Sequence, residues 1–163
     1  MSRAFVKEQD DQADRETPVR PQSPHINYVT PRGLALLRQK VEELAAARQT
    51  LAGREDLSSQ PALRELDREL AYYSERLSRA VRVEPRMADD AVHFGASVCV
   101  EDATGERMTV VIVGEDEADV ATGRISWVSP LAKALMNARV GDVVTWRRPA
   151  GDRELEILAI NGG

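Results

Sequence analysis

Residues 30–51 read TPRGLALLRQKVEELAAARQTL, and this stretch decides how the first half of the chain folds. Thr30 and Pro31 form a typical helix start, because the hydroxyl accepts hydrogen bonds from free backbone N–H groups and proline needs no donor in the first turn. The apolar residues that follow recur at alternating steps of three and four, which predicts a coiled-coil seam on one helix face. They are Leu34, Leu37, Val41, Leu44 and Leu51.

A second apolar seam follows a connection that contains Gly53 and Pro61. Neither helix can bury its stripe alone, and a short connection makes the two helices antiparallel neighbours. The sequence therefore predicts an antiparallel coiled-coil hairpin, whose arms of about 22 residues are roughly 33 Å long. We call residues 28–83 the finger. The second seam consists of Leu63, Leu66, Leu70, Tyr73, Leu77 and Ala80.

The second half of the chain changes to a period of two, which is typical of strands. Apolar residues alternate from Val92 to Val100, and a short helix is expected after Ser129 and Pro130. Five strands joined mainly by hairpins, with one helix, predict an α+β fold with a mostly antiparallel sheet. We call residues 84–163 the globule. The other four expected strands cover residues 108–113, 124–128, 143–147 and 154–160.

Residues 1–27 differ from both of these parts. They mix charges with prolines and offer few apolar anchors, which predicts a flexible tail, because ordering such a segment costs backbone entropy without compensating burial. The start of this tail, Ser2 to Glu8, is less tail-like, since Phe5 and Val6 are apolar enough to dock on a surface.

The charge and cysteine content narrow the class of protein. With 22 basic and 27 acidic residues the chain carries a net charge of −5, which disfavours a protein that grips duplex DNA through its phosphates. The single cysteine, Cys99, rules out an intramolecular disulfide and fits a reducing compartment. No apolar run reaches the roughly 20 residues of a membrane span. We therefore expect a cytoplasmic protein that does not interact with membranes.

The inventory of reactive residues argues against a self-contained enzyme. Cys99, His25 and His93 are too few for a structural zinc site, which takes about four ligands. The sequence contains neither a glycine-rich phosphate loop nor a nucleophile elbow around a serine. His93 lies in a strand-like stretch, where we interpret it as a half-exposed sheet residue rather than a general base.

Several short fragments occur in a fixed order along the chain. They begin at Tyr28–Gly33 and continue with Phe94–Ala96, Ile112–Gly114, Ile125–Ser126, Ser129–Leu135, Val140–Asp142 and Pro149–Gly151. Together they resemble the bacterial GreA/GreB family of transcription elongation factors, and Ser2 to Glu8 is similar to a GreB-like subgroup. The resemblance implies a coiled-coil finger followed by an FKBP-like globular domain. It also implies an accessory factor that binds the RNA polymerase core at the rim of the secondary channel and inserts the finger.

In that family, acids at the finger tip hold Mg²⁺ and a water, so that the polymerase cleaves backtracked RNA. The matching stretch here begins with Asp56, which the resemblance implies as a catalytic tip acid and as a Mg²⁺ ligand within the polymerase complex, with Glu55 as a substitute partner. Ser59 stands where the second family acid belongs. Both arms are also shorter than the family pattern, by about six to nine residues or roughly 9–14 Å of reach. Asp56 and Glu55 are alternatively solvated turn residues favoured near a helix N-terminus.

The resemblance places the polymerase-binding loop at Trp127, Val128, Ser129 and Pro130. The family usually has Asp-Ser-Pro here, so Val128 replaces a charged contact with an apolar one. An exposed Trp127 would be an anchor for a partner, whereas a buried one would belong to the core. Ser129 and Pro130 have an alternative role as the start of a helix.

Several alternatives stay open at this point. The protein either stimulates transcript cleavage, or it occupies the channel without cleaving and competes with other factors, as Rnk-like short-finger relatives do. An FKBP-like domain also allows prolyl isomerase activity, although residues 84–163 offer few aromatic side chains for the required pocket. Finger arginines are candidates for contact with nascent RNA. Because the hairpin satisfies both seams internally, we expect a monomer rather than a dimer.

Overall fold

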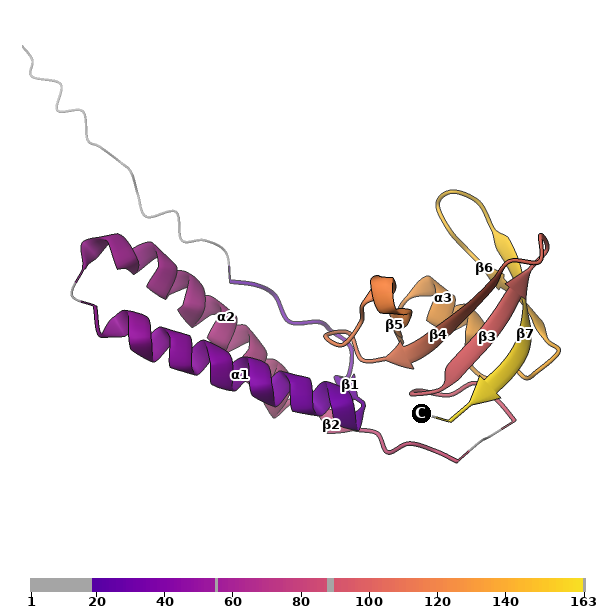
Figure 1. Cartoon of the computed structure of the whole chain (residues 1–163), viewed down its shortest axis with the longest axis horizontal. Coiled ribbons are helices and arrows are strands. Elements are labelled where there is room, and N and C mark those ends of the chain that lie inside the picture. Colours follow the sequence, from indigo (N-terminus) through magenta and orange to yellow (C-terminus); the bar gives the residue numbers. More distant parts are fainter. Residues whose placement is uncertain (1–18, 55, 88–89, 163) are drawn as a thin grey trace, which may run out of the picture.

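The structure, a computed structural model, describes residues 19–54, 56–87 and 90–162. The molecule is elongated, with the helical finger at one end and a curled sheet at the other (Figure 1). Of the expected tail, residues 1–18 lie outside the described residues, and residues 19–27 lead into the finger. Across the described ranges, no helix has the length and apolar character of a membrane span.

The finger is the expected antiparallel hairpin, formed by α1 (Pro31–Ala52) and α2 (Gln60–Ser78). Thr30 caps α1 as expected, because its Oγ1 accepts a hydrogen bond from the backbone N–H of Gly33 at 2.9 Å. Leu37 and Leu44 of the first seam are fully buried, and the other seam residues of both helices are half-buried between them. Burial of both stripes against each other confirms the hairpin prediction.

A parallel pair of short strands closes the base of the finger. β1 (Tyr28–Val29) lies beside β2 (Val81–Arg82), just before α1 and just after α2. The N–H of Val81 donates to the carbonyl of Asn27 at 2.8 Å, and the N–H of Val83 donates to the carbonyl of Val29 at 2.9 Å. Two-residue strands have no detectable period, which explains why the sequence did not predict them.

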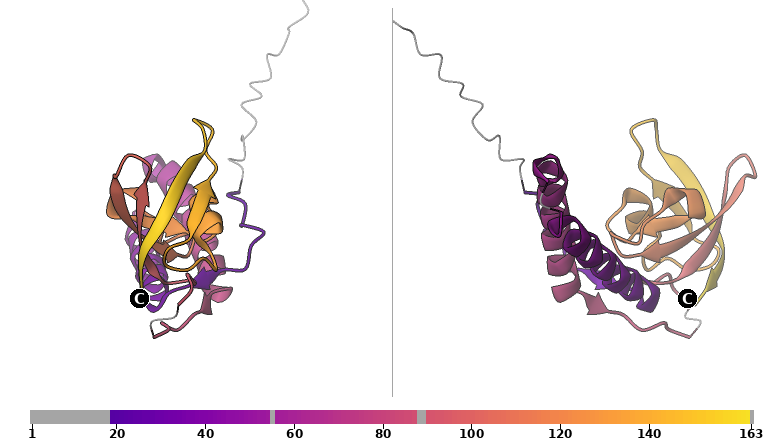
Figure 2. Two further views of the ribbon diagram at one scale, coloured as in Figure 1. Left: turned by 90° about the vertical axis from the view of Figure 1, so that its right-hand side faces the viewer. Right: turned by 60° about the vertical axis from the view of Figure 1, so that its left-hand side comes forward.

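The globule contains one curled five-stranded sheet, visible in Figure 2. Its strand order is β5-β4-β3-β7-β6, and every neighbouring pair is antiparallel except β4 and β5. The chain passes through a short 3₁₀ helix, η2 (Val120–Thr122), and so returns parallel to β4. The strands are β3 (Ser97–Asp102), β4 (Arg107–Val113), β5 (Arg124–Ser126), β6 (Val143–Trp146) and β7 (Arg153–Asn161).

The first globule strand is shorter than the alternation predicted. The pattern from Val92 suggested a long strand, but β3 begins only at Ser97, because the chain turns at Gly95 with a positive φ of 88°. Val92 and Ala96 are nevertheless buried in the core. The alternation thus placed the strand boundary too early. The interpretation of His93 as a half-exposed sheet residue is also wrong, because His93 is only 8% exposed and precedes the strand.

The core of the globule lies between the sheet and the short helix α3 (Pro130–Leu135). Leu131, Ala132 and Leu135 of this helix are buried and belong to the same apolar cluster as the sheet residues. The sheet residues in this cluster are Val98, Val100, Val110, Ile112, Leu155 and Ile157. The globule therefore has a core of its own, separate from the seams of the finger.

Gly114 marks a close approach between the finger base and the globule. A Cβ atom at this position would lie 2.4 Å from the carbonyl oxygen of Tyr28, whose backbone belongs to β1. No real Cβ contact is that short, so the two backbones can meet this closely only if residue 114 is glycine.

Replacing Gly114 with alanine should lower the free energy of unfolding by about 1–3 kcal/mol, because the backbones must separate to admit the methyl group. Gly53→Ala is the matched control: a Cβ there meets only ordinary contacts of 3.6 and 3.8 Å. The control should be neutral or stabilising by up to about 1 kcal/mol. Urea denaturation of both variants measures the difference, and equal stabilities would contradict the close approach.

Candidate functional site

The finger tip is organised by the Asp56 carboxylate. Asp56 precedes a short 3₁₀ helix, η1 (Leu57–Ser59), and its Oδ1 accepts hydrogen bonds from the backbone N–H of Ser58 at 2.8 Å and from the Ser58 hydroxyl at 2.6 Å. These hydrogen bonds lower the pKa of Asp56. The Asp56 carboxylate is therefore ionised. It caps the turn while the residue remains exposed to solvent.

Ser59 does not present its hydroxyl to solvent. The residue is only 8% exposed, and its Oγ donates to the backbone carbonyl of Asp56 at 2.6 Å. Leu57, by contrast, is 88% exposed and projects from the same turn. Ser59, which the resemblance matches to the second family acid, therefore stabilises the turn through a hydrogen bond within it.

The described donor set does not fit a Mg²⁺ site at the tip. Mg²⁺ is held by carboxylates and other oxygen ligands in strict octahedral geometry. Asp56 is the one acid of the tip within the described residues, because Glu55 lies outside them. Nowhere in the described ranges do three or more His, Cys, Asp or Glu side chains gather as potential ligands. Asp56 can therefore supply one ligand to a Mg²⁺ ion, and the other ligands would have to come from elsewhere.

The predicted polymerase-binding loop connects β5 to α3. Ser129 caps α3, since its Oγ accepts a hydrogen bond from the N–H of Ala132 at 3.3 Å. Trp127 is half-buried and packs against Tyr28, with ring centroids 5.2 Å apart. Val128 is half-buried as well, and Pro130 is exposed. Val128 and Pro130 therefore offer this loop's apolar surface, while Trp127 lies at the joint with the finger base.

An acidic loop, residues 115–117, reaches from the end of β4 to the finger. Its central contact is with Arg76 on α2, whose side chain is only 3% exposed. The Arg76 guanidinium donates to Asp116 Oδ2 at 2.6 Å and to Glu115 Oε2 at 3.4 Å. Tyr72 donates its hydroxyl to the other oxygen of Asp116 at 3.3 Å. Burial and the nearby Asp116 charge together raise the pKa of Tyr72, so this hydroxyl stays protonated.

The third acid of the loop, Glu117, holds the start of α1. Its buried carboxylate accepts hydrogen bonds from the Thr30 hydroxyl at 2.5 Å and from the Arg32 guanidinium at 3.1 Å. A Cβ on Gly33 would lie 2.6 Å from the same carboxylate, so the acid fits here because residue 33 lacks a side chain. The Thr30 hydroxyl therefore caps α1 and also connects this helix to the globule through Glu117.

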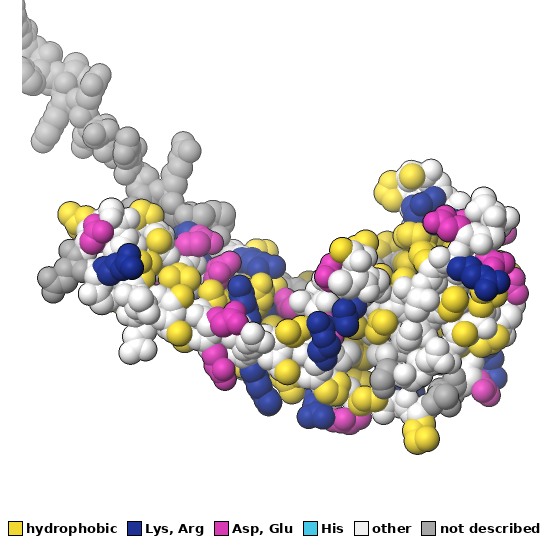
Figure 3. Space-filling model, in the orientation of Figure 1, with side chains coloured by type: hydrophobic (Ala, Val, Ile, Leu, Met, Phe, Trp, Pro, Cys, Tyr) yellow, Lys and Arg dark blue, Asp and Glu magenta, His cyan; other side chains and the backbone are white. Residues whose placement is uncertain are grey.

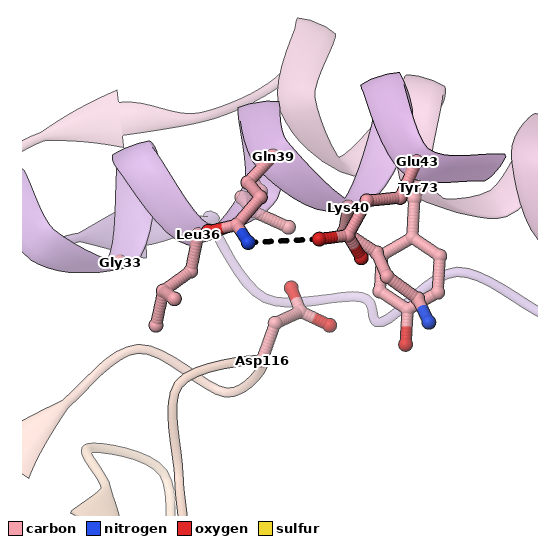
Figure 4. A pocket seen from close by; sticks show the side chains of 8 residues that line it. Gly33, Leu36, Gln39, Lys40, Glu43, Tyr73 and Asp116 are labelled. Atoms are coloured by element: carbon pink, nitrogen blue, oxygen red, sulfur yellow. Dashed lines mark hydrogen bonds between the residues drawn. The ribbon is translucent and has the colours of Figure 1, made fainter. Parts of the chain in front are cut away.

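A pocket of about 260 Å³ separates α1 from the acidic loop next to these contacts. Figure 4 shows Asp116 on its loop facing the side chains of α1, with Gln39 and Glu43 joined by a hydrogen bond of 2.8 Å. Leu36, Lys40 and Tyr73 line the same space. On this side of the joint, the acidic loop therefore contacts the finger through separate polar interactions with an open space beside them.

Sequence reasoning did not find this joint. The excess of acids in residues 84–120, with 10 acidic and 2 basic residues, was the available signal, since three of the acids are consecutive at 115–117. The role of these acids is to bind Arg76, which is separated from the loop by about 40 positions in the chain. An arginine on a helix rich in charges gives no sequence indication that it is buried.

Replacing Arg76 with methionine should cost about 3 kcal/mol of stability, because it leaves the half-buried carboxylates of Asp116 and Glu115 without their cation. Arg79→Met is the matched control: Arg79 lies nearly one turn further along and is 63% exposed, and it pairs with Glu75. This exposed pair should contribute less than about 1 kcal/mol. Thermal unfolding followed by circular dichroism distinguishes the two, and similar losses would contradict a buried role for Arg76.

Comparisons with known proteins agree with the sequence resemblance. Residues 87–162 match the family model described as "Transcription elongation factor, GreA/GreB, C-term". The chain is 38% identical over 151 residues to transcription elongation factor GreB of Neisseria meningitidis, covering 82% of this chain and 93% of that protein. It is 51% identical over 70 residues to transcription elongation factor GreA of Methylococcus capsulatus, covering 42% of this chain and 44% of that protein.

Among solved structures, the crystal structure of GreA factor homolog 1 (Gfh1) of Thermus thermophilus is 29% identical. The match covers 85% of this chain and 100% of that one, with a TM-score of 0.42. The nearly full-length match to GreB, together with the family model, settles the assignment. The chain belongs to the GreA/GreB family of transcription elongation factors.

Proposed function

We propose that this elongation factor binds the RNA polymerase core with its globule at the rim of the secondary channel and places its finger in that channel. The observation that carries the proposal is a two-helix finger projecting from a separately cored globule, with Arg76 and the acidic loop at the joint. In this arrangement the protein is a cytoplasmic accessory factor, and the polymerase supplies the chemistry. Both seams face each other within one hairpin, which supports a monomer.

We further propose that the finger modulates elongation without stimulating transcript cleavage. The Ser59 hydroxyl is directed into the turn, and the Asp56 carboxylate is engaged by Ser58. Ser59 offers no second acid where the resemblance implies one, and a neutral hydroxyl is a poorer Mg²⁺ ligand than a carboxylate. Such a factor would occupy the channel and compete with cleavage factors.

A second candidate function is transcript cleavage, favoured by the exposed and ionised carboxylate of Asp56. Mg²⁺ would then be shared with the polymerase. Contact between finger arginines and the RNA end is a smaller part of the proposal, because Arg48 and Arg68 already pair with Asp67 and Glu65. Figure 3 shows basic and acidic side chains interspersed along the visible face of the finger, rather than a stripe of one charge.

The loop from Trp127 to Pro130 is the proposed contact with the polymerase. Introducing a cation by Val128→Lys should weaken retention of core RNA polymerase by about tenfold or more, as expected for a change at the centre of an interface. Val120→Lys is the matched control, because Val120 is 86% exposed on a different part of the globule. Binding is measured with immobilised protein and purified polymerase. Equal affinities of the two variants would remove the loop from the interface, and no binding by the unaltered protein would overturn the proposed function.

Stalled, backtracked polymerase complexes separate the two mechanisms. The unaltered protein should leave the RNA length unchanged in the presence of Mg²⁺ while slowing cleavage stimulated by an added GreA. Asp56→Ala should compete equally well, because Asp56 only caps the tip turn. Mg²⁺-dependent shortening of the RNA that disappears in Asp56→Ala, but not in the exposed-acid control Asp152→Ala, would establish cleavage instead.

A further inference from the structure

The segment before the finger contacts both halves of the molecule. Residues 20–27, which we call the strap, run from beside α2 to the start of β1 (Figure 1). The sequence predicted a flexible tail up to residue 27, because this segment has few apolar residues. Pro21 and Pro24 belong to the strap, and their fixed φ angles reduce the conformational entropy lost when such a segment is ordered.

The first set of strap contacts is with the second helix of the finger. The Arg20 guanidinium lies 3.9 Å from the ring centroid of Tyr72, in a cation–π arrangement. Gln22 donates from Nε2 to the backbone carbonyl of the same tyrosine at 3.2 Å. Asn27 and Arg76 exchange two hydrogen bonds of 2.7 Å, one through the Arg76 carbonyl and one through its guanidinium. The strap is thus held along about one turn of α2, from Tyr72 to Arg76.

The second set of contacts is with the globule. Ser23 donates its hydroxyl to Glu115 Oε1 at 2.9 Å, and Glu115 also accepts from Arg76. The His25 ring meets the edge of Trp127, with centroids 5.9 Å apart and planes inclined by 74°. Ser23 and His25 therefore connect the strap to two places on the globule, the acidic loop and the loop before α3.

The remaining joint leaves room for movement. Direct contacts between finger and globule in the described ranges include the acidic loop at Arg76 and Thr30 and the aromatic group of Tyr28, Phe94 and Trp127. The backbones of Tyr28 and Gly114 also meet closely at the finger base. The 260 Å³ pocket beside the acidic loop and a second pocket of about 360 Å³ under the finger base flank these contacts. Close packing resists motion, whereas open space beside a narrow contact permits rotation. The strap adds attachment points to this joint.

We propose that the strap is a splint that fixes the direction of the finger relative to the globule, which makes Arg20, Gln22 and Ser23 positioning residues for the tip. This proposal rests on the proposed function for its consequence in transcription, but the splint itself is a property of the isolated protein. Without it, the finger samples more directions, and the tip is less often aligned with the channel.

The distance between the two halves can be measured by pulsed electron paramagnetic resonance. Spin labels at Gln49→Cys, near the end of α1, and Thr145→Cys, in β6, report on the finger and the globule, and both sites are exposed. The single native cysteine is removed by Cys99→Ser. Labels on a helix and a strand keep local motion out of the measured distribution.

The test variant combines Arg20→Ala, Gln22→Ala and Ser23→Ala in the full-length chain, and Val19→Ala is the control, since Val19 is 80% exposed and precedes the contacts. Each hydrogen bond removed should shift the ratio of aligned to misaligned fingers by about two- to tenfold. The expected result is a broader or displaced distance distribution for the triple variant, with unchanged circular dichroism and an unchanged distribution for Val19→Ala. Identical distributions in all three proteins would overturn the splint.

Polymerase assays on the same variants distinguish the splint proposal from the proposal that the protein binds RNA polymerase. The triple variant should bind the polymerase core as well as the unaltered protein, because the docking loop is intact. Its effect on elongation should fall about tenfold, because a smaller fraction of the fingers is aligned with the channel. A full elongation effect in a variant with a broadened distribution would contradict the positioning role. Loss of binding by the unaltered protein would overturn the polymerase proposal and leave the distance result standing.

Discussion

The arrangement of the two halves depends on one buried cation. Arg76 is shared by the strap, the acidic loop and the helix that carries it, through Asn27, Asp116 and Glu115. A buried guanidinium is tolerated when its donors are satisfied, and its removal leaves uncompensated charges. The same residue therefore stabilises the joint and determines which surfaces can meet there, since its planar fork fits carboxylate and amide oxygens in fixed directions.

How much of this structure the sequence predicts depends on how far apart in the chain the interacting residues lie. The hairpin, the Thr30 cap and the Ser129 cap were predictable, because helix periodicity and capping depend on residues a few positions apart. The strands and their mostly antiparallel pairing were predictable from the alternation, apart from the early turn at Gly95, whereas the strand order and the parallel pairing of β4 and β5 were not. The parallel pair of β1 and β2 was not, because its strands are too short to carry a pattern.

At the candidate site, the sequence predicted which residues lie at the finger tip and in the docking loop, but not which contacts their side chains make. Asp56 was identified as a tip acid, and Ser59 as a departure from the family pattern. That Ser59 faces inward and braces the turn depends on backbone geometry, which a serine in a loop does not disclose. The sequence does not decide between anchor and core for Trp127. The side chain is half-buried against the globule core and also contacts Tyr28, and this second contact becomes visible only once both halves are assembled.

The route of the chain has a mechanical consequence. Among the described residues, the finger is joined covalently to the globule only through the segment that follows β2, while the polar contacts of the joint hold the opposite side. A lateral force at the tip acts on an arm of about 33 Å, so the torque on these contacts grows in proportion to finger length. A longer finger would load its attachment more than this one does, and a shorter finger would load it less.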